Sequence, residues 1–210
     1  MKKILLFTLF LCFAAPHARA LDAQSAQSFA ETLADDIMRD VVKSKTPLTQ
    51  KRDAFRKIFT GAINVKSSAR FTLGRFAKSA SPDDVKAYTD ALVDNIVFTW
   101  AERFNNYAGE TIEFTGARQS ERGGDFYVSS KIDIPNGENA IEIIWRVVDK
   151  KGETKLADLI VEGVSMLMSY RNEYTAVLQQ NGGSVADLTA KLRAKNETLK
   201  NPAKKSGAKD

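Results

Sequence analysis

Residues 126–147 read FYVSSKIDIPNGENAIEIIWRV, and this stretch decides the fold class. Apolar and polar side chains alternate on both sides of the Pro-Asn-Gly sequence at residues 135–137. Alternation with a period of two is typical of a strand that buries one face, and Asn-Gly accepts the positive φ angles of tight hairpin turns. The stretch therefore predicts two antiparallel strands joined by a hairpin.

The same alternation continues in both directions along the chain. Before the stretch, Ile112 and Phe114 fall on one face of a further strand. After it, a Lys-Lys-Gly turn at residues 150–152 precedes another apolar segment at residues 156–161. Four consecutive strands joined by short turns predict a four-stranded antiparallel meander.

Upstream of the strands, the apolar period changes to that of helices. Apolar residues recur at every fourth position between residues 22 and 43, which predicts a first helix. A second helix is expected to begin at Thr46-Pro47, with Thr as the cap and Pro in the first turn, and to end near Gly61. A shorter third helix covers residues 65–73.

A longer helix is predicted from Ser81-Pro82 to about residue 105, because a capping Ser is followed by Pro and two acidic residues. It carries two apolar stripes, one through Leu92 and Ile96 and one through Val97 and Trp100. Together they are wider than one buried face requires. We expect this helix to contact the sheet on one side and a second apolar surface on the other.

Downstream of the strands, helical periodicity returns from Val164 to about residue 180, and Ser184 caps a last amphipathic helix. Residues 196–210 have no apolar period and are predicted to be a disordered basic tail. The predicted fold class is α+β: one domain at residues 21–195, with a four-stranded antiparallel sheet whose concave face is covered by helices.

The first twenty residues have the pattern of a secretory signal peptide. Two lysines precede an apolar run that ends at Ala18-Arg19-Ala20, so we expect cleavage before Leu21. The run is too short to span a bilayer. The Ala-x-Ala site predicts a soluble protein exported to a bacterial periplasm rather than a lipoprotein anchored through Cys12.

The rest of the chain contains neither histidine nor cysteine, because the single copies, His17 and Cys12, lie within the first twenty residues. This composition excludes disulfides, thiol nucleophiles, Cys/His zinc sites and Ser-His-Asp triads after cleavage. We therefore expect no metal site and no cofactor.

The positive charge of the chain belongs to its two ends. The whole chain has 31 basic and 26 acidic residues and a net charge of +5, whereas residues 21–190 hold 21 basic and 24 acidic residues, or −3. A basic balance confined to the termini is poor support for nucleic-acid binding. We expect no nucleic-acid partner.

Few polar residues are candidates for catalysis or for ligand binding. Gly163-Val164-Ser165 begins like a nucleophile elbow, but with no histidine to activate it we interpret Ser165 as a helix cap. Asp158, Glu162 and Glu173 are candidate acid–base carboxylates, and Arg171 is a candidate anion ligand, although each also suits a structural role. More informative is the excess of large apolar side chains, which indicates either a dense core or an apolar cavity under a curved sheet.

Several segments are distinctive: LIVEGVSM at residues 159–166, YRNEY at 170–174, QQNGG at 179–183 and FTLGR at 71–75. Together they resemble the MlaC family of periplasmic phospholipid carriers, also called toluene-tolerance proteins. The resemblance covers nearly the whole chain after the signal. It departs at Thr154, where members commonly carry Trp, and at Phe76-Ala77-Lys78, where Trp-Arg is frequent.

The resemblance implies an NTF2-like or related α+β fold and a lipid carrier that holds phospholipid acyl chains in an apolar cavity. It also implies two partners, an inner-membrane ABC transporter complex with its substrate-receiving subunit and an outer-membrane lipoprotein–porin complex. The residues that we expect to line the cavity and bind lipid are Phe71, Phe76, Leu92, Ile96, Trp100, Ile143, Trp145, Val147, Leu159, Val161, Val164, Leu167 and Tyr170.

Two alternatives stay open. A branch of the same family is associated with hopanoids, so the departures at Thr154 and at residues 76–78 are compatible with a carrier of hopanoids or of another apolar ligand. The second alternative is a small NTF2-like enzyme that uses Asp158 or Glu162 with a tyrosine for proton transfer.

Overall fold

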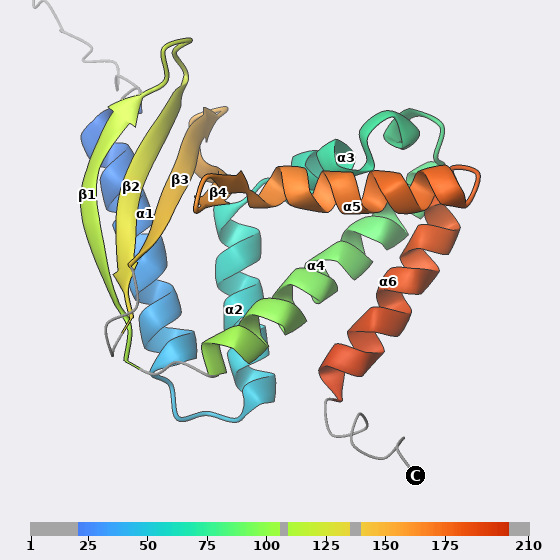
Figure 1. Ribbon diagram of the computed structural model, residues 1–210, viewed down its shortest axis with the longest axis horizontal. Coiled ribbons are helices and arrows are strands. Elements are labelled where there is room, and N and C mark those ends of the chain that lie inside the picture. Colours follow the sequence, from blue (N-terminus) through green and yellow to red (C-terminus); the bar gives the residue numbers. More distant parts are fainter. Residues whose placement is uncertain (1–20, 106–108, 135–139, 202–210) are drawn as a thin grey trace, which may run out of the picture.

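The structure is a computed structural model that describes residues 21–105, 109–134 and 140–201. The chain divides into an antiparallel sheet with one long helix against it and a layer of helices beside them (Figure 1). This arrangement confirms the predicted α+β class. The predicted signal peptide, the hairpin turn at residues 135–137 and residues 202–210 lie outside the described residues.

Within the described residues the sheet has five strands in sequential order, each antiparallel to its neighbour. Four of them form the predicted meander, and the pairing of Ile132 with Ile141 sets the register of its central hairpin. The strands are β1 (Thr111–Gln119), β2 (Asp125–Asp133), β3 (Ile141–Lys150), β4 (Glu153–Val161) and β5 (Val164–Ser165).

The short strand β5 corrects the prediction of four strands and of a helix beginning at Val164. Glu162 and Gly163 have φ angles of 49° and 76°, so the chain reverses there. Val164 and Ser165 then pair with the end of β4, and the helix begins only at Met166. Two consecutive residues with positive φ make a tight turn, which the apolar pattern does not reveal.

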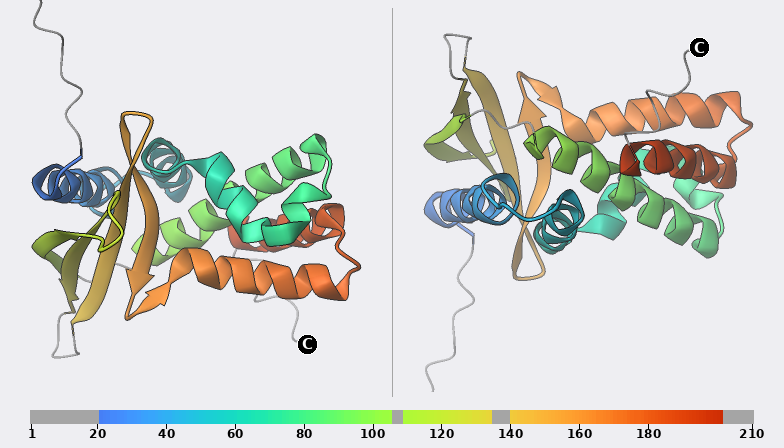
Figure 2. Two further views of the ribbon diagram at one scale, coloured as in Figure 1. Left: turned by 90° about the horizontal axis from the view of Figure 1, so that it is seen from above. Right: turned by 90° about the horizontal axis from the view of Figure 1, so that it is seen from below.

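The inner face of the sheet carries Phe126 and Val128 from β2 and Trp145 and Val147 from β3, all buried. Helix α1 (Ala23–Ile37) lies against this face and contacts β1 to β4. Its buried side is largely alanine, which lets the helix approach the strands closely. Figure 2 shows α1 beside the strands in both of its views.

The predicted first helix is present, but its last turn is a π-helix, η1 (Met38–Val42). Helix α2 (Leu48–Ala62) begins later than predicted, because Pro47 is extended and the Thr46 hydroxyl is hydrogen-bonded to Ser44 rather than capping the helix. Gly61 does not end α2, which reaches Ala62. The third predicted helix is α3 (Val65–Leu73), followed by a 3-10 helix, η2 (Gly74–Lys78).

Helix α4 (Pro82–Asn105) has the predicted start, since the backbone N–H of Asp84 donates to Ser81 Oγ at 3.0 Å. One of its stripes, through Tyr88 and Leu92, packs with α3 and the two C-terminal helices, and the other, through Val93 and Val97, packs with α2. The predicted packing of α4 directly on the sheet is therefore wrong. Other helices pack on most of both stripes, while Ile96 and Trp100 border spaces that the sheet also lines.

The C-terminal helices are α5 (Met166–Gln180) and α6 (Val185–Lys200). Helix α6 passes the predicted domain boundary at residue 195, so residues 196–200 are helical rather than part of a disordered tail. Asn196 is buried there, where it accepts from Asn95 Nδ2 at 2.8 Å and donates to the Ala91 carbonyl at 2.9 Å. No helix in the part of the chain that the structure describes is long and apolar enough to cross a membrane.

Candidate lipid-binding cavity

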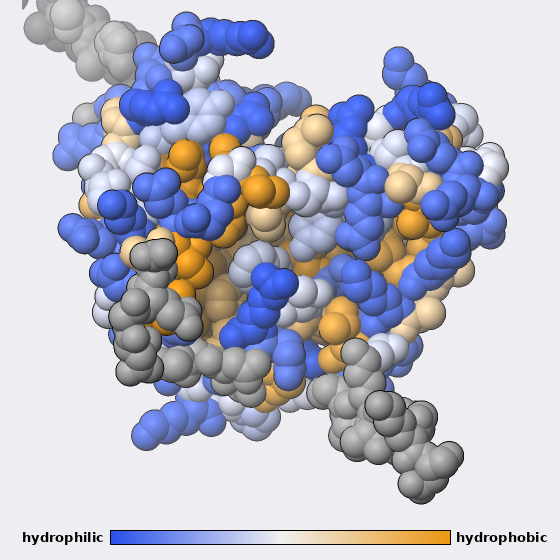
Figure 3. All heavy atoms as spheres, viewed as in Figure 1, coloured by the Kyte–Doolittle hydropathy of each residue, from blue (hydrophilic) through white to orange (hydrophobic). Residues whose placement is uncertain are grey.

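A cavity of about 400 Å³ lies between the inner face of the sheet and the helices α1, η1, α2 and α4. Strands β1 to β4 form one wall with residues such as Ile112, Ile143 and Val161, and helices form the other with residues such as Phe55 and Ile96. Figure 3 shows apolar atoms gathered along a hollow between the strands and the helices. The cavity is thus a space between apolar faces of the sheet and of the helices, which touch over only part of their extent.

Three of the 24 residues that line this cavity are polar: Arg103, Glu110 and Thr111. They come from the C-terminal end of α4 and from the beginning of β1, which lie at the same end of the molecule (Figure 1). Arg103 is exposed, and its guanidinium lies 5.0 Å from the centre of the Trp100 ring. The cavity therefore has an apolar interior and a polar end that meets solvent.

A smaller pocket of about 90 Å³ lies next to the cavity, between α3, α4, α5 and β4. The two spaces share six wall residues. The shared residues are Phe59, Ile63, Ile96, Trp100, Leu156 and Leu159. The smaller pocket extends the apolar space towards the seam between α3 and α5.

Nine of the thirteen residues predicted to line a cavity do border one of these spaces. Those on the large cavity are Ile96, Trp100, Ile143, Trp145, Leu159 and Val161. Those on the smaller pocket alone are Leu92, Leu167 and Tyr170. The structure therefore brings together residues from α4, β3, β4 and α5 that are distant in sequence.

The other four predicted residues line neither space. Val147 is fully buried in the core between α1 and the sheet, and Val164 projects from β5 with 53% of its surface exposed. Phe71 lies on the outer side of α3 under the guanidinium of Arg171. Phe76 packs against the helical core and lies close to Gly183. Three of these side chains contact neighbouring elements, and Val164 faces solvent.

Comparison with known proteins agrees with this geometry. The family model described as MlaC protein matches residues 27–194. The chain belongs to the MlaC family.

A curated MlaC-family relative from Haemophilus influenzae is 24% identical over 160 residues, which are 74% of each chain. That protein is named the intermembrane phospholipid transport system binding protein MlaC. The solved structure of a phospholipid-binding protein from Ralstonia solanacearum, in complex with a phospholipid, superposes with a TM-score of 0.73 at 21% identity. The match covers 83% of this chain and 98% of that one, so the MlaC-type fold extends over the described domain.

The MlaC-family cavity also has walls that sequence analysis missed. Helix α1, η1 and α2 contribute many of them, among them Leu33, Ile37, Met38 and Phe59. The stripe through Leu33 and Ile37 is visible in the sequence, but periodicity shows only that a helix face is apolar. Whether that face meets side chains or an empty space depends on the distance between the layers.

Polar groups near the cavity walls have partners that keep the walls apolar. The indole N–H of Trp145 donates to Ser130 Oγ at 2.9 Å, so the ring can face the cavity without an unpaired donor. Tyr170 stacks on Tyr174, with ring centres 5.9 Å apart. Burial raises the pKa of the Tyr170 phenol above its ordinary value, so the phenol stays protonated at neutral pH.

Ser165 and the candidate acid–base residues Asp158 and Glu162 form hydrogen bonds near the turn that precedes α5. Ser165 Oγ accepts from the Met168 N–H at 3.0 Å, which confirms the predicted cap. Asp158 accepts hydrogen bonds from the Ser165 hydroxyl and from the Leu167 N–H. Glu162 accepts from the Glu142 N–H at an exposed turn. Among the described residues, no group of three or more acidic, histidine or cysteine side chains could hold a metal ion.

Proposed function

We propose that this MlaC-family chain is a periplasmic carrier that holds phospholipid acyl chains in the cavity and moves the lipid between the inner and outer membranes. The observation that carries the proposal is the distribution of polarity around the cavity. Its wall is apolar except at one end, where Arg103, Glu110 and Thr111 lie. A phospholipid has the same distribution, with apolar tails and one polar headgroup.

The free energy of exposing lipid tails explains why a carrier is needed. Two acyl chains with about 30 methylenes in total cost on the order of 24 kcal/mol to expose to water, at ~0.8 kcal/mol for each methylene. Free diffusion of a phospholipid through an aqueous space is therefore negligible. A cavity of about 400 Å³ lies within the ~300–1,000 Å³ range of ligand sites.

The proposed location and partners rest on the sequence and on the relatives. The first twenty residues have the pattern of a signal for export. The Haemophilus influenzae relative is named for an intermembrane phospholipid transport system. On this basis the carrier would exchange lipid with an ABC transporter complex and its substrate-receiving subunit at the inner membrane, and with a lipoprotein–porin complex at the outer membrane.

Phospholipid is favoured over a hopanoid by the position of the residues that depart from the family pattern. Thr154 lies on the surface of β4 beside Ser28 and Thr32 of α1, outside the cavity. Residues 76–78 form part of η2 and do not line it. Neither departure therefore lies in the wall of the main cavity.

A carrier is also favoured over an enzyme. Asp158 and Tyr170 border the same small pocket, but both oxygens of Asp158 already accept hydrogen bonds from the start of α5. With both oxygens already hydrogen-bonded, this carboxylate stabilises the start of α5 and is not available to a substrate.

Extraction of the purified, exported protein with organic solvent, followed by mass spectrometry, tests the proposal. We expect phospholipid in near-stoichiometric amount. The Ile143→Asp variant should lose it, because an unpaired carboxylate would face the acyl chains. Ile144→Asp places the same carboxylate on the opposite face of β3 and is the control. Release of a hopanoid, or of no lipid, would contradict the proposed ligand.

A further inference from the structure

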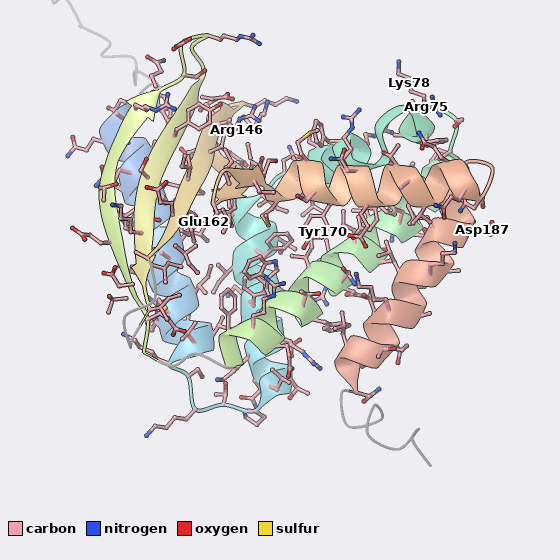
Figure 4. The ribbon with its side chains drawn as sticks, viewed as in Figure 1. Arg75, Lys78, Arg146, Glu162, Tyr170 and Asp187 are labelled. Carbon is pink, nitrogen blue, oxygen red and sulfur yellow. The ribbon has the colours of Figure 1, made fainter. Side chains whose placement is uncertain are left out.

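The surface formed by α3, η2 and α5, called here the α3–α5 face, carries a group of unpaired positive charges. Residues 64–82 contain Lys66, Arg70, Arg75 and Lys78 and no acidic residue. All four side chains are exposed, and α5 adds Arg171 beside them. None of the five forms an ion pair with another described residue. Figure 4 shows Arg75 and Lys78 pointing away from the body of the molecule.

The same face and the adjoining strand β5 carry the exposed apolar side chains. Among the described residues, the large apolar side chains that are exposed are Phe71 at 36%, Met168 at 43% and Val164 at 53%. Phe71 belongs to α3, and the other two lie at the beginning of α5 and in β5. Single apolar side chains between cations are typical of surfaces that insert into the headgroup region of a membrane.

The guanidinium groups of two arginines lie over aromatic rings. The Arg171 guanidinium lies 4.6 Å from the centre of the Phe71 ring, and that of Arg75 lies 4.9 Å from the centre of the Phe76 ring. A guanidinium over the face of a ring still has N–H groups that can bind a phosphate through two hydrogen bonds. The arrangement suits phosphate groups that approach from outside the protein.

The smaller pocket lies beneath this face. Its walls include Val65, Ser68 and Thr72 of α3 and Met166, Leu167 and Tyr170 of α5. Most of these side chains are only partly buried, so the seam between the two helices is partly open. The left view of Figure 2 shows α3 and α5 side by side along this seam. The smaller pocket therefore lies between the α3–α5 face and the main cavity, with which it shares wall residues.

We propose that the α3–α5 face docks onto the surface of a phospholipid bilayer that contains anionic lipids. This inference rests on the proposed function, since a lipid carrier must meet a lipid donor or acceptor. The five cations complement anionic phosphates, and Phe71, Met168 and Val164 suit the boundary between headgroups and acyl chains. A bilayer also explains why the cations carry no fixed partners, because mobile lipids can move to them.

Sedimentation with vesicles tests the docking surface. We expect the chain after residue 20 to bind vesicles of phosphatidylcholine with phosphatidylglycerol, to bind pure phosphatidylcholine weakly, and to dissociate at high salt. The triple variant R70Q/R75Q/K78Q should bind the anionic vesicles on the order of a hundredfold more weakly. Met168→Ser should reduce binding further when combined with it, because an inserted apolar side chain is lost.

The control variant R122Q/K131Q/K150Q removes the same charge from exposed positions of the sheet and its turns and should bind like the unmodified protein. Equal loss in both triple variants would overturn the proposal, because net charge alone would then explain binding. No binding of the unmodified protein to anionic vesicles would also overturn it and would point to an acidic protein partner. Lipid extraction from the same samples tests the carrier function separately: R70Q/R75Q/K78Q should still contain lipid.

Discussion

At the scale of single residues, Ser165 shows how a motif that suggests catalysis can serve a helix. Its hydroxyl donates to Asp158 and accepts from the Met168 N–H. Ser165→Ala should lower the free energy of unfolding by about 0.5–2 kcal/mol, through loss of the cap, and leave lipid content unchanged. Thermal or urea unfolding measures the first quantity and mass spectrometry the second.

Ser169→Ala is the matched control for this cap. Ser169 lies one turn further along α5, is exposed and only donates to the Ser165 carbonyl. It should unfold like the unmodified protein. Loss of bound lipid in Ser165→Ala with unchanged stability would show that Ser165 takes part in ligand binding instead.

Substitutions of two residues on the same face of β3 should distinguish a cavity position from a core position. Ile143 lines the cavity, whereas Val147 is fully buried among the side chains of α1 and the sheet. Ile143→Asp should fold without lipid, because water that enters the empty cavity can solvate the carboxylate. Val147→Asp should fail to fold, because its carboxylate has no such space. Circular dichroism with lipid extraction distinguishes the two results, and a folded, lipid-loaded Ile143→Asp protein would exclude this wall from the site.

At the scale of elements, the turn between α5 and α6 depends on a close contact. Gly183 has a φ of 86°, and a Cβ there would lie 3.0 Å from the Phe76 ring. Gly182 also has a positive φ, of 70°, but a Cβ at that position would point into open space, with no contact within 4 Å. Gly183→Ala should therefore be more destabilising than Gly182→Ala.

We expect Gly182→Ala to cost about 1–2 kcal/mol for the left-handed backbone alone. Gly183→Ala should add about 1–3 kcal/mol for displacing the Phe76 ring. Chemical unfolding of both variants gives the difference. Equal stabilities would mean that the ring moves aside freely and that Phe76 does not fix how the turn packs.

At the scale of the whole molecule, the sheet with α1 and the helical layer have separate cores, and the cavity lies where the two layers face each other. A ligand that fills it adds contacts between the layers and stabilises the folded state by mass action. Removal of bound lipid should therefore lower the melting temperature, and adding phospholipid back should restore it.

The control for lipid removal is the Ile143→Asp variant. Because it should contain no lipid, the same solvent treatment should leave its melting temperature unchanged. Scanning calorimetry on both proteins before and after extraction makes the comparison. An equal decrease in both would show that the solvent damages the protein rather than removing a ligand.

Local sequence signals are sufficient to predict the long helices and strands of this protein and their order. Period-two alternation located the four long strands, and the Ser81 cap located the start of α4, because these signals depend on neighbouring residues. The end of α6 was not determined in this way. Asn196 is polar, so the apolar pattern of the sequence gives no sign that it is buried. It lies buried because it forms hydrogen bonds with Asn95 and with the Ala91 carbonyl of α4.

Which apolar side chains surround a space depends on how the helices pack against the sheet. Ile143, Val147 and Val164 are equally apolar in the sequence, but the first lines the cavity, the second fills the core and the third is exposed. The physical reason is that periodicity records the preference of a side chain to leave water. Whether it then meets a helix, a gap or solvent depends on how far apart the two layers lie, and residues distant in the chain set that distance.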